Sequence, residues 1–184
     1  MTRLLSWLLQ CERQLFFWIN HRMHHRITSF VLYSFTHLGG ATFTIACSSL
    51  IALFSPAPWS MAGWQALLAL GISHIPVVLI KKVYPRLRPH VAMPDIRTFR
   101  KPLVDHSFPS GHSTAAFSII VPFIALMPQL AWILVPAASI VALSRMYLGL
   151  HYPSDCLAGA ILGAGTAALT VSLWPSNLMD YSFV

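Results

Sequence analysis

The stretch that decides the fold is residues 113–143, STAAFSIIVPFIALMPQLAWILVPAASIVAL, which contains no Asp, Glu, Lys or Arg. A transmembrane helix needs about 20 predominantly apolar residues, so this stretch is too long for one ordinary span. The dipeptide Pro128-Gln129, near its middle, is typical of a turn. We therefore predict two helices, over 107–127 and 130–150, folded back on each other as a hairpin. A single long tilted helix is the competing interpretation.

Further apolar runs flank this hairpin. Residues 27–54 contain no Asp, Glu, Lys or Arg and are long enough to cross a bilayer. A Pro-rich turn follows, and 61–80 is another uncharged run of about the length that a bilayer requires. A last span is predicted over 154–174, where Gly159-x-x-x-Gly163 offers a face for close helix packing. The chain is therefore predicted to contain about five spans.

The N-terminal segment has a different pattern. Glu12 and Arg13 interrupt its apolar run, and a charge at the centre of a span costs about 2.5–3.5 kcal/mol on insertion scales. Apolar residues at helical spacing, together with Trp7 and Trp18, favour a helix that lies in the membrane interface. We predict an interfacial amphipathic helix over residues 1–26.

The composition agrees with a membrane protein. Hydrophobic residues make up 56% of the chain and charged residues only 9%, against roughly 25% charged in a soluble domain. This excludes a disordered chain, a coiled coil and a typical cytosolic enzyme. The net charge of +7 suggests contact with anionic lipid rather than with nucleic acid. The predicted fold class is an all-α polytopic membrane bundle, with residues 1–184 forming one domain.

Three polar clusters lie on one face of the predicted topology, because an odd number of spans brings the segments that carry them to the same side. The clusters are Lys81-x6-Arg88-Pro89, Pro109-Ser110-Gly111-His112 and Ser144-Arg145-x5-His151-x3-Asp155.

Each of these residues also has a structural interpretation. Lys81 and Arg88 could be cations that flank a helix end. His112 and His151 could be packing or interfacial histidines, and Asp155 could cap the last helix. A cation such as Arg145, which follows a long apolar run, needs a partner. The order of the clusters and their shared face favour a common function instead.

The chemistry that this set supports is phosphoryl transfer. Three cations, Lys81, Arg88 and Arg145, are enough to hold a dianionic phosphate. Ser110 adds a hydroxyl, and Gly111 lets the backbone approach an anion at a helix N-terminus.

The two histidines complete this chemistry. Stepwise transfer needs one histidine to attack phosphorus and one to protonate the leaving oxygen. Asp155 lies four residues after His151, so its carboxylate can reach that imidazole from a helical turn. Because the cations can neutralise the phosphate oxygens, we expect no metal and no other cofactor.

The three clusters resemble the motifs of the type 2 phosphatidic acid phosphatase family, which includes bacterial undecaprenyl diphosphate and phosphatidylglycerophosphate phosphatases. The resemblance covers residues 81–155. It implies a helical bundle with His151 as the nucleophile, Asp155 as its partner and His112 as the general acid. The phosphate ligands that it implies are Lys81 rather than Lys82, Arg88 rather than Arg86, and Ser110, Gly111 and Arg145.

The function that follows is hydrolysis of a lipid phosphate monoester or diphosphate. Chain length and the amphipathic N-terminus resemble the undecaprenyl diphosphate phosphatases, so undecaprenyl diphosphate is the expected substrate. Phosphatidylglycerophosphate and phosphatidate are the alternatives within the family. From another class, a lipid-phosphate binding protein or transporter could use the same cations without turnover. Against this alternative, no acidic or basic residue lies in the middle of a predicted span to mark a permeation route.

The charge distribution and the family resemblance predict opposite orientations in the membrane. All Lys and Arg residues fall on the motif side of the predicted topology, and the positive-inside rule places that side in the cytoplasm. The resemblance implies an active site on the extracytoplasmic face. We follow the resemblance and expect a multi-pass protein of the cell membrane.

Other histidines are expected to serve the structure. His37 and His74 lie inside predicted spans and are interpreted as hydrogen-bonded packing residues. His21, His24 and His25 stand beside arginines, which favours a helix end facing lipid headgroups over a metal site.

Overall fold

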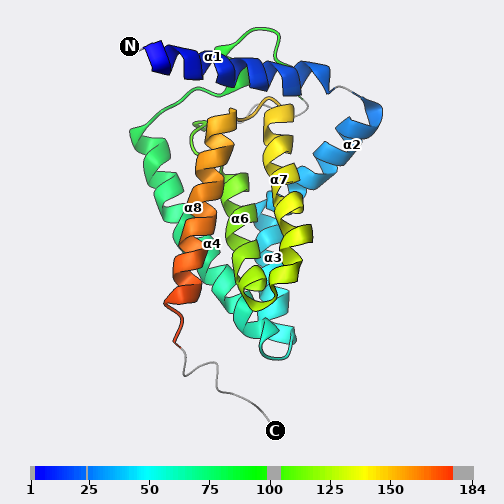
Figure 1. Ribbon diagram of the computed structural model, residues 1–184, viewed down its shortest axis with the longest axis vertical. Helices are drawn as coiled ribbons and strands as arrows, with labels where there is room; N and C mark the ends of the chain where they lie inside the picture. Colours follow the sequence, from blue (N-terminus) through cyan, green and yellow to red (C-terminus); the bar gives the residue numbers. More distant parts are fainter. Residues whose placement is uncertain (1–2, 24, 99–104, 176–184) are drawn as a thin grey trace.

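The computed structural model describes residues 3–23, 25–98 and 105–175, and every regular element in these ranges is a helix (Figure 1). The long helices run side by side as a bundle, and the N-terminal helix α1 (Arg3–Phe17) lies across one end of it (Figure 1). The predicted all-α bundle with an additional N-terminal helix is confirmed. His24 and residues 99–104 and 176–184 lie outside the described residues.

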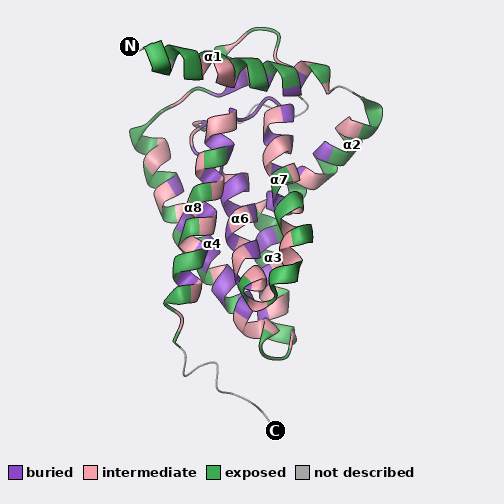
Figure 2. Cartoon of the chain, viewed as in Figure 1, coloured by how far each residue is buried: buried purple, intermediate pink, exposed green. Residues whose placement is uncertain are grey.

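α1 and the turn of π-helix η1 that continues it (Trp18–Arg22) are apolar on two sides. Phe16 and Ile19 are buried against the bundle. Trp7 and Trp18, in contrast, are exposed large hydrophobic residues, and Figure 2 shows most of α1 as exposed. Exposed tryptophans on a helix at the end of a membrane bundle are typical of an interfacial helix.

The predicted span 27–54 is a bent helix pair rather than one straight helix. It consists of α2 (Arg26–Phe35), a 3₁₀ turn η2 (Thr36–Gly39) and α3 (Ala41–Phe54), with a bend of 58° between the two parts. Gly40 has an extended backbone (φ −76°, ψ 149°). A Cβ on Gly39 would lie 2.8 Å from the carbonyl oxygen of His112. The two glycines therefore break the helix where the chain passes another helix closely.

The predicted hairpin is confirmed, and the single long helix is excluded. Its two arms are α6 (Gly111–Leu126) and α7 (Ala131–Tyr147), joined through the 3₁₀ turn η3 (Pro128–Leu130). The remaining elements are α4 (Trp59–Val83), the short α5 (Pro89–Ala92) and α8 (Pro153–Ser172).

Three helical segments among the described residues are long and apolar enough to cross a membrane: Trp59–Val83, Pro128–Tyr147 and Pro153–Ser172. The bent α2–α3 pair is a fourth if it forms one span. α6 is apolar but has only 16 residues, about 24 Å at 1.5 Å per residue. It begins at Gly111 rather than near residue 107, and the backbone before it is irregular. Irregular backbone at membrane depth is tolerated where protein surrounds it.

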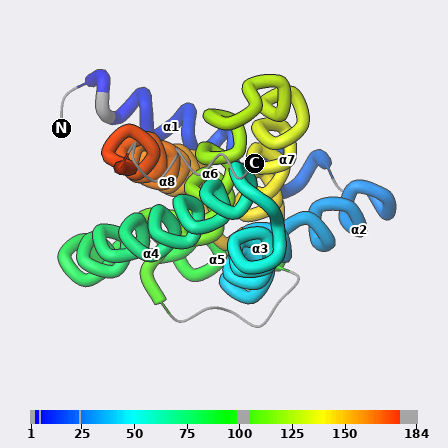
Figure 3. Tube along the Cα trace, turned by 90° about the horizontal axis from the view of Figure 1, so that it is seen from below, coloured from blue at the N-terminus to red at the C-terminus, as the bar shows by residue number. Residues whose placement is uncertain are grey.

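α6 occupies the middle of the bundle. It contacts α3, α4, α7 and α8, and a view along the bundle shows those helices around it (Figure 3). Its buried residues are mostly small: Ser113, Thr114, Ala115, Ala116 and Ser118. Small side chains let helix backbones approach closely, which is how helices associate where the solvent is lipid.

The closest approach is between α6 and α8, at the predicted packing face Gly159-x-x-x-Gly163, which is confirmed. A Cβ on Gly159 would lie 2.5 Å from the Ser110 carbonyl oxygen. A Cβ on Gly163 would overlap the Thr114 carbonyl oxygen. Both obstacles are backbone atoms, so a side chain could enter only if the helices moved apart.

This packing predicts opposite effects of the same substitution at two glycines of α8. Gly163→Ala should destabilise the bundle by about 1–3 kcal/mol through overpacking. Gly165→Ala, where nothing lies within 4 Å of the new Cβ, should leave stability unchanged or raise it by up to ~1 kcal/mol through helix propensity. Thermal unfolding of the two variants in one detergent measures the difference. Equal midpoints would contradict the close approach.

Candidate active site

A cavity of about 730 Å³ brings six of the predicted site residues together. Lys81 lies at the end of α4, Arg88 in the following loop, Gly111 and His112 in the first turn of α6, Arg145 near the end of α7, and His151 before α8. The rest of the lining is mainly apolar and comes mostly from α3 and α4, including Ile45, Leu70, Val77 and Val78. The cavity is therefore charged at one end and apolar along its length. Ser110 and Asp155 are not among the residues that line it.

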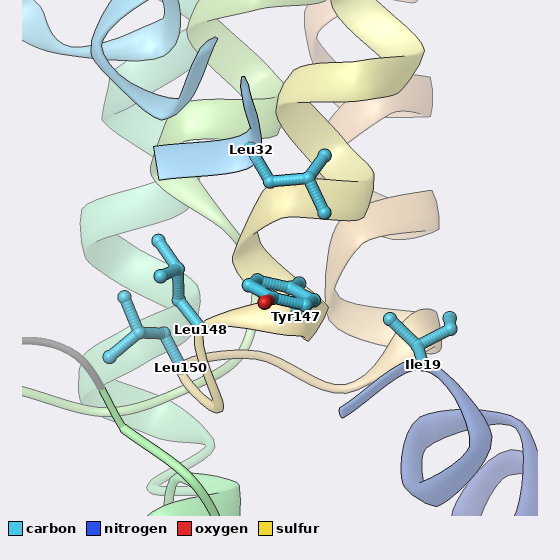
Figure 4. Packing of buried hydrophobic residues seen from close by; sticks show 5 residues of the cluster. All are labelled: Ile19, Leu32, Tyr147, Leu148 and Leu150. Carbon is cyan, nitrogen blue, oxygen red and sulfur yellow. The ribbon is translucent and has the colours of Figure 1, made fainter. Parts of the chain in front are cut away.

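His151 is positioned by a buried turn. Tyr147, Leu148 and Leu150 precede it and pack in one cluster with Ile19 and Leu32 (Figure 4). The turn therefore rests on α2 and on the N-terminal segment, and it does not depend on α7 and α8 alone.

Gly149 makes the turn possible. Its φ is +73°, in the left-handed region that residues with a side chain rarely adopt. A Cβ there would lie 2.9 Å from the carbonyl oxygen of Arg97. The chain therefore needs glycine two residues before His151.

The hydrogen bonds of His151 define which ring nitrogen carries the proton. Nδ1 lies 2.7 Å from the backbone carbonyl oxygen of Ser107, which can only accept. Nδ1 must therefore be the protonated nitrogen of the neutral ring. Nε2 then carries the lone pair of the ring, which accepts a hydrogen bond from Nη1 of Arg88 at 3.1 Å. The result is a neutral imidazole with its unprotonated nitrogen beside a guanidinium.

The charge state of His151 follows from its surroundings. The side chain is 2% exposed. Burial lowers the pKa of His151 to about 4, and the positive charges of Arg145 and Arg88 act in the same direction against the opposing charge of Asp155. The ring is therefore neutral near pH 7.

Asp155 is fully buried beside this ring. Its Oδ2 lies 3.7 Å from His151 Nδ1 and accepts from the Ser107 hydroxyl and from the Tyr152 amide at 2.8 Å. The amide contact forms a capping box at the start of α8. Asp155 thus caps the N-terminus of α8 and also faces His151. Its interpretation as a helix cap and its interpretation as the partner of His151 are therefore compatible.

Two of the predicted cations share a carboxylate that lies outside the three clusters. Asp105 forms ion pairs with Lys81 through Oδ2 and with Arg88 through Oδ1, the latter at 2.6 Å. Burial alone would raise the pKa of Asp105, but the hydrogen bond from Lys81 and the charge of Arg88 lower it to about 2. Its two oxygens occupy positions that two phosphate oxygens could take. No spacing pattern distinguished Asp105 from the other polar residues of its loop.

Arg145 and Ser110 are both buried but differ in role. Arg145 lines the cavity and donates from Nη1 to the Thr36 hydroxyl at 2.8 Å, which ties α7 to the bend at η2. The Ser110 hydroxyl caps α6 by accepting from the Ser113 amide at 3.4 Å. The Ser110 amide also donates to the Asp155 carbonyl oxygen at 3.0 Å. Ser110 therefore joins the N-termini of α6 and α8.

His74 is a further cavity residue. Its Nδ1 lies 2.8 Å from the Leu70 carbonyl oxygen, the hydrogen bond expected of a packing histidine inside a helix. It also lines the cavity beside Gly111. Within the part of the chain that the structure describes, no group of three or more His, Cys, Asp or Glu residues could hold a metal ion.

Comparison with known proteins identifies relatives of the chain. Phosphatidylglycerophosphatase B of Bacillus subtilis is 30% identical over 150 residues, which cover 72% of this chain and 68% of that protein. An undecaprenyl-diphosphatase of Sulfolobus acidocaldarius is 36% identical over 95 residues, covering 50% of this chain and 46% of that protein. The chain thus spans about half the length of the first curated relatives that it matches.

A solved structure has the same fold. LpxE of Aquifex aeolicus superposes with a TM-score of 0.78 at 24% sequence identity, covering 86% of this chain and 93% of that one. The sequence pattern of the PAP2 superfamily matches residues 62–179, which contain all three clusters. With this match over most of its length, the chain belongs to the PAP2 superfamily.

Proposed function

We propose that this protein is an integral membrane phosphatase that hydrolyses a lipid phosphate monoester or diphosphate through a phosphohistidine intermediate on His151. The observation that carries the proposal is the Nε2 atom of His151, unprotonated and 3.1 Å from Arg88. It lies at the charged end of a cavity that is otherwise apolar. A nucleophile in such a place suits a substrate with a phosphate at one end and a hydrocarbon tail at the other.

Three cations would hold the phosphate. Lys81, Arg88 and Arg145 line the cavity around His151, and the first turn of α6 adds a helix N-terminus that Ser110 caps. An incoming phosphate would take the place of the Asp105 carboxylate on Lys81 and Arg88. With its oxygens neutralised by these groups, phosphorus can be attacked without a metal ion.

In the first step Arg88 Nη1 turns its hydrogen bond from Nε2 to a phosphate oxygen, and the Nε2 lone pair then attacks phosphorus. An N–P bond forms, the P–O bond to the lipid breaks, and its electron pair goes to the leaving oxygen. His112, protonated at the start, gives that oxygen its proton. The positive charge that develops on the His151 ring is stabilised by Asp155, while Ser107 keeps Nδ1 as the proton-bearing nitrogen.

In the second step a water molecule attacks the phosphohistidine. A new P–O bond forms, the N–P bond breaks, and its electron pair returns to Nε2. His112 accepts a proton from the attacking water, so both histidines regain their starting states when inorganic phosphate leaves. Both residues line one cavity, as the two steps require.

Single substitutions of the two histidines should lower activity far more than substitution of a histidine outside the cavity. We expect His151→Ala to lower phosphate release by roughly 10³-fold or more, and His112→Ala by about 10²–10⁴-fold. His25→Ala, an exposed histidine outside the cavity, is the matched control and should keep full activity. Release of inorganic phosphate is measured with undecaprenyl diphosphate, phosphatidylglycerophosphate and phosphatidate in detergent.

The same assay tests the substrate. We propose undecaprenyl diphosphate, so its kcat/KM should exceed that of the two glycerophospholipids, and the opposite order would point to the alternative substrates. Binding of all three lipids without release of phosphate would identify a lipid-phosphate binding protein instead.

The pH dependence should reflect the neutral state of His151. Because the pKa of His151 is lowered to about 4, the nucleophile stays unprotonated as the pH falls through 6.5, and activity is lost only nearer pH 4. The groups that face this ring are Arg88, Arg145 and Asp155. The measurement is kcat/KM between about pH 3.5 and pH 8, of which the acidic limb is the part that matters. The ionisation of the substrate phosphate is titrated separately, and its effect on kcat/KM is removed from the profile. A limb centred near pH 6.5 would contradict the buried neutral histidine.

We propose further that the active site faces the extracytoplasmic side, as in the family that the clusters resemble. An impermeant maleimide should then label Thr98→Cys in intact cells, because Thr98 is exposed near the α1 end of the bundle. Ser55→Cys, in the turn between α3 and α4, should react only after the cells are permeabilised. The reverse pattern would show that the positive-inside rule holds for this chain.

A further inference from the structure

Arg86 has contacts that the proposed chemistry does not use. It lies two residues before Arg88 but is not among the residues that line the cavity. Nη1 donates to Asp155 Oδ1 and to the Ser154 hydroxyl, both at 2.7 Å. Nη2 donates to Glu12 Oε2 at 2.8 Å. The guanidinium also lies over the ring of Tyr152, 4.0 Å from its centre.

Glu12, the second acidic partner of Arg86, lies on α1. Its second oxygen, Oε1, accepts from the Ser154 amide at 3.1 Å and from the Ser154 hydroxyl. A carboxylate in the first turn of a helix is favourable for the amides there, so Glu12 acts as an N-terminal cap for α8 from another helix. One turn further along α1, the fully buried Phe16 packs on Tyr152, with ring centroids 5.7 Å apart.

We propose that Arg86, held in place by Glu12, is a positioning residue for Asp155, and that Glu12 thereby links α1 to the active site. The inference rests on the proposed function, because it assigns Arg86 an effect through Asp155 and His151. Arg86 binds Oδ1 of the carboxylate, which leaves Oδ2 for the Ser107 hydroxyl and for Nδ1 of His151.

Burial makes this pair different from a surface ion pair. Exposed pairs contribute little because water solvates both partners. The Asp155 side chain is 0% exposed, and the side chains of Arg86 and Glu12 are only 20% and 12% exposed. Without Arg86, Asp155 Oδ1 would be a buried charge without its cation. The carboxylate would then rotate or take up a proton and lose its effect on the imidazolium that forms during attack.

A positioning role for Arg86 predicts an effect on kcat and not on KM. The proposed phosphate ligands are Lys81, Arg88 and Arg145, whereas the Arg86 side chain donates to Asp155, Ser154 and Glu12. The loss of Arg86 should therefore lower kcat and leave KM and the inhibition constant for vanadate nearly unchanged. A purely structural role would lower the amount of folded protein, or change all three values together.

The experiment compares four test variants and one control variant of the full chain in detergent. Arg86→Gln should lower kcat by about 10–100-fold, and Arg86→Lys should restore part of the loss. Glu12→Gln should lower kcat less, because the Arg86–Asp155 pair remains. Arg86→Gln combined with Glu12→Gln should have a kcat close to that of Arg86→Gln alone, because the effect of Glu12 on Asp155 passes through Arg86. The loss of the Glu12 contacts with Ser154 should appear as lower stability instead. Arg13→Gln, which removes an exposed cation next to Glu12 on α1, is the control and should match the unmodified protein.

The possible failures are distinguishable. Full kcat in Arg86→Gln, beside an inactive His151→Ala, would overturn this inference alone. An active His151→Ala would overturn the proposed mechanism whatever Arg86 does. If both Arg86 variants fail to fold, Glu12→Gln decides: a lower kcat at constant KM supports the inference, and an unchanged kcat or a raised KM overturns it.

Discussion

The close approach of α6 and α8 is the constraint on which the proposed active site depends. Gly159 and Gly163 let α8 contact the backbone of α6 directly. A hydrogen bond from the Ser110 amide to the Asp155 carbonyl oxygen then joins the two helix N-termini. Because the first turn of α6 carries His112 and the first turn of α8 follows His151, this contact brings both histidines to one cavity. Larger residues at the glycines would separate the two halves of the site.

The polar network around His151 shows how a membrane bundle holds buried charge. Arg88 is 2% exposed, and all three of its donor nitrogens bind carbonyl oxygens, a carboxylate or the histidine. Asp155 is equally well satisfied by a guanidinium, a hydroxyl and an amide. Buried charges are stable only when their hydrogen bonds are made. The same contacts fix the orientation of the His151 ring, so they stabilise the buried charges and also position the proposed nucleophile.

The N-terminal segment contributes more than attachment to a membrane surface. Glu12 contacts the first turn of α8, Phe16 packs on Tyr152, and Asn20 donates to the Tyr147 carbonyl oxygen at 2.8 Å. These residues share one face of the segment, and exposed apolar residues such as Trp7 occupy another. The segment thus contacts the turn before His151 and the start of α8 on one side, and it has an apolar surface suited to lipid on the other.

Local sequence determined the helical class of this protein, the hairpin turn at Pro128 and the packing face at Gly159 and Gly163. Each of these depends on features that neighbouring residues express by themselves: the length of an uncharged run, a helix-breaking residue, or the absence of a side chain. The order and spacing of the three clusters also sufficed to select six residues that share one cavity.

Tertiary structure decided the rest, because it depends on which distant segments meet. The bend at Gly40 lies where the chain passes close to α6. Asp105 is a partner of Lys81 and Arg88 because the fold places it beside the end of α4. Ser107 was predicted to begin a helix, yet its carbonyl oxygen determines the tautomer of His151. Glu12 was recognised only as an interruption of an apolar run. A buried charge pairs with whichever opposite charge lies next to it in the folded protein. The separation of Glu12 and Arg86 along the chain therefore gives no sign that the two side chains are in contact.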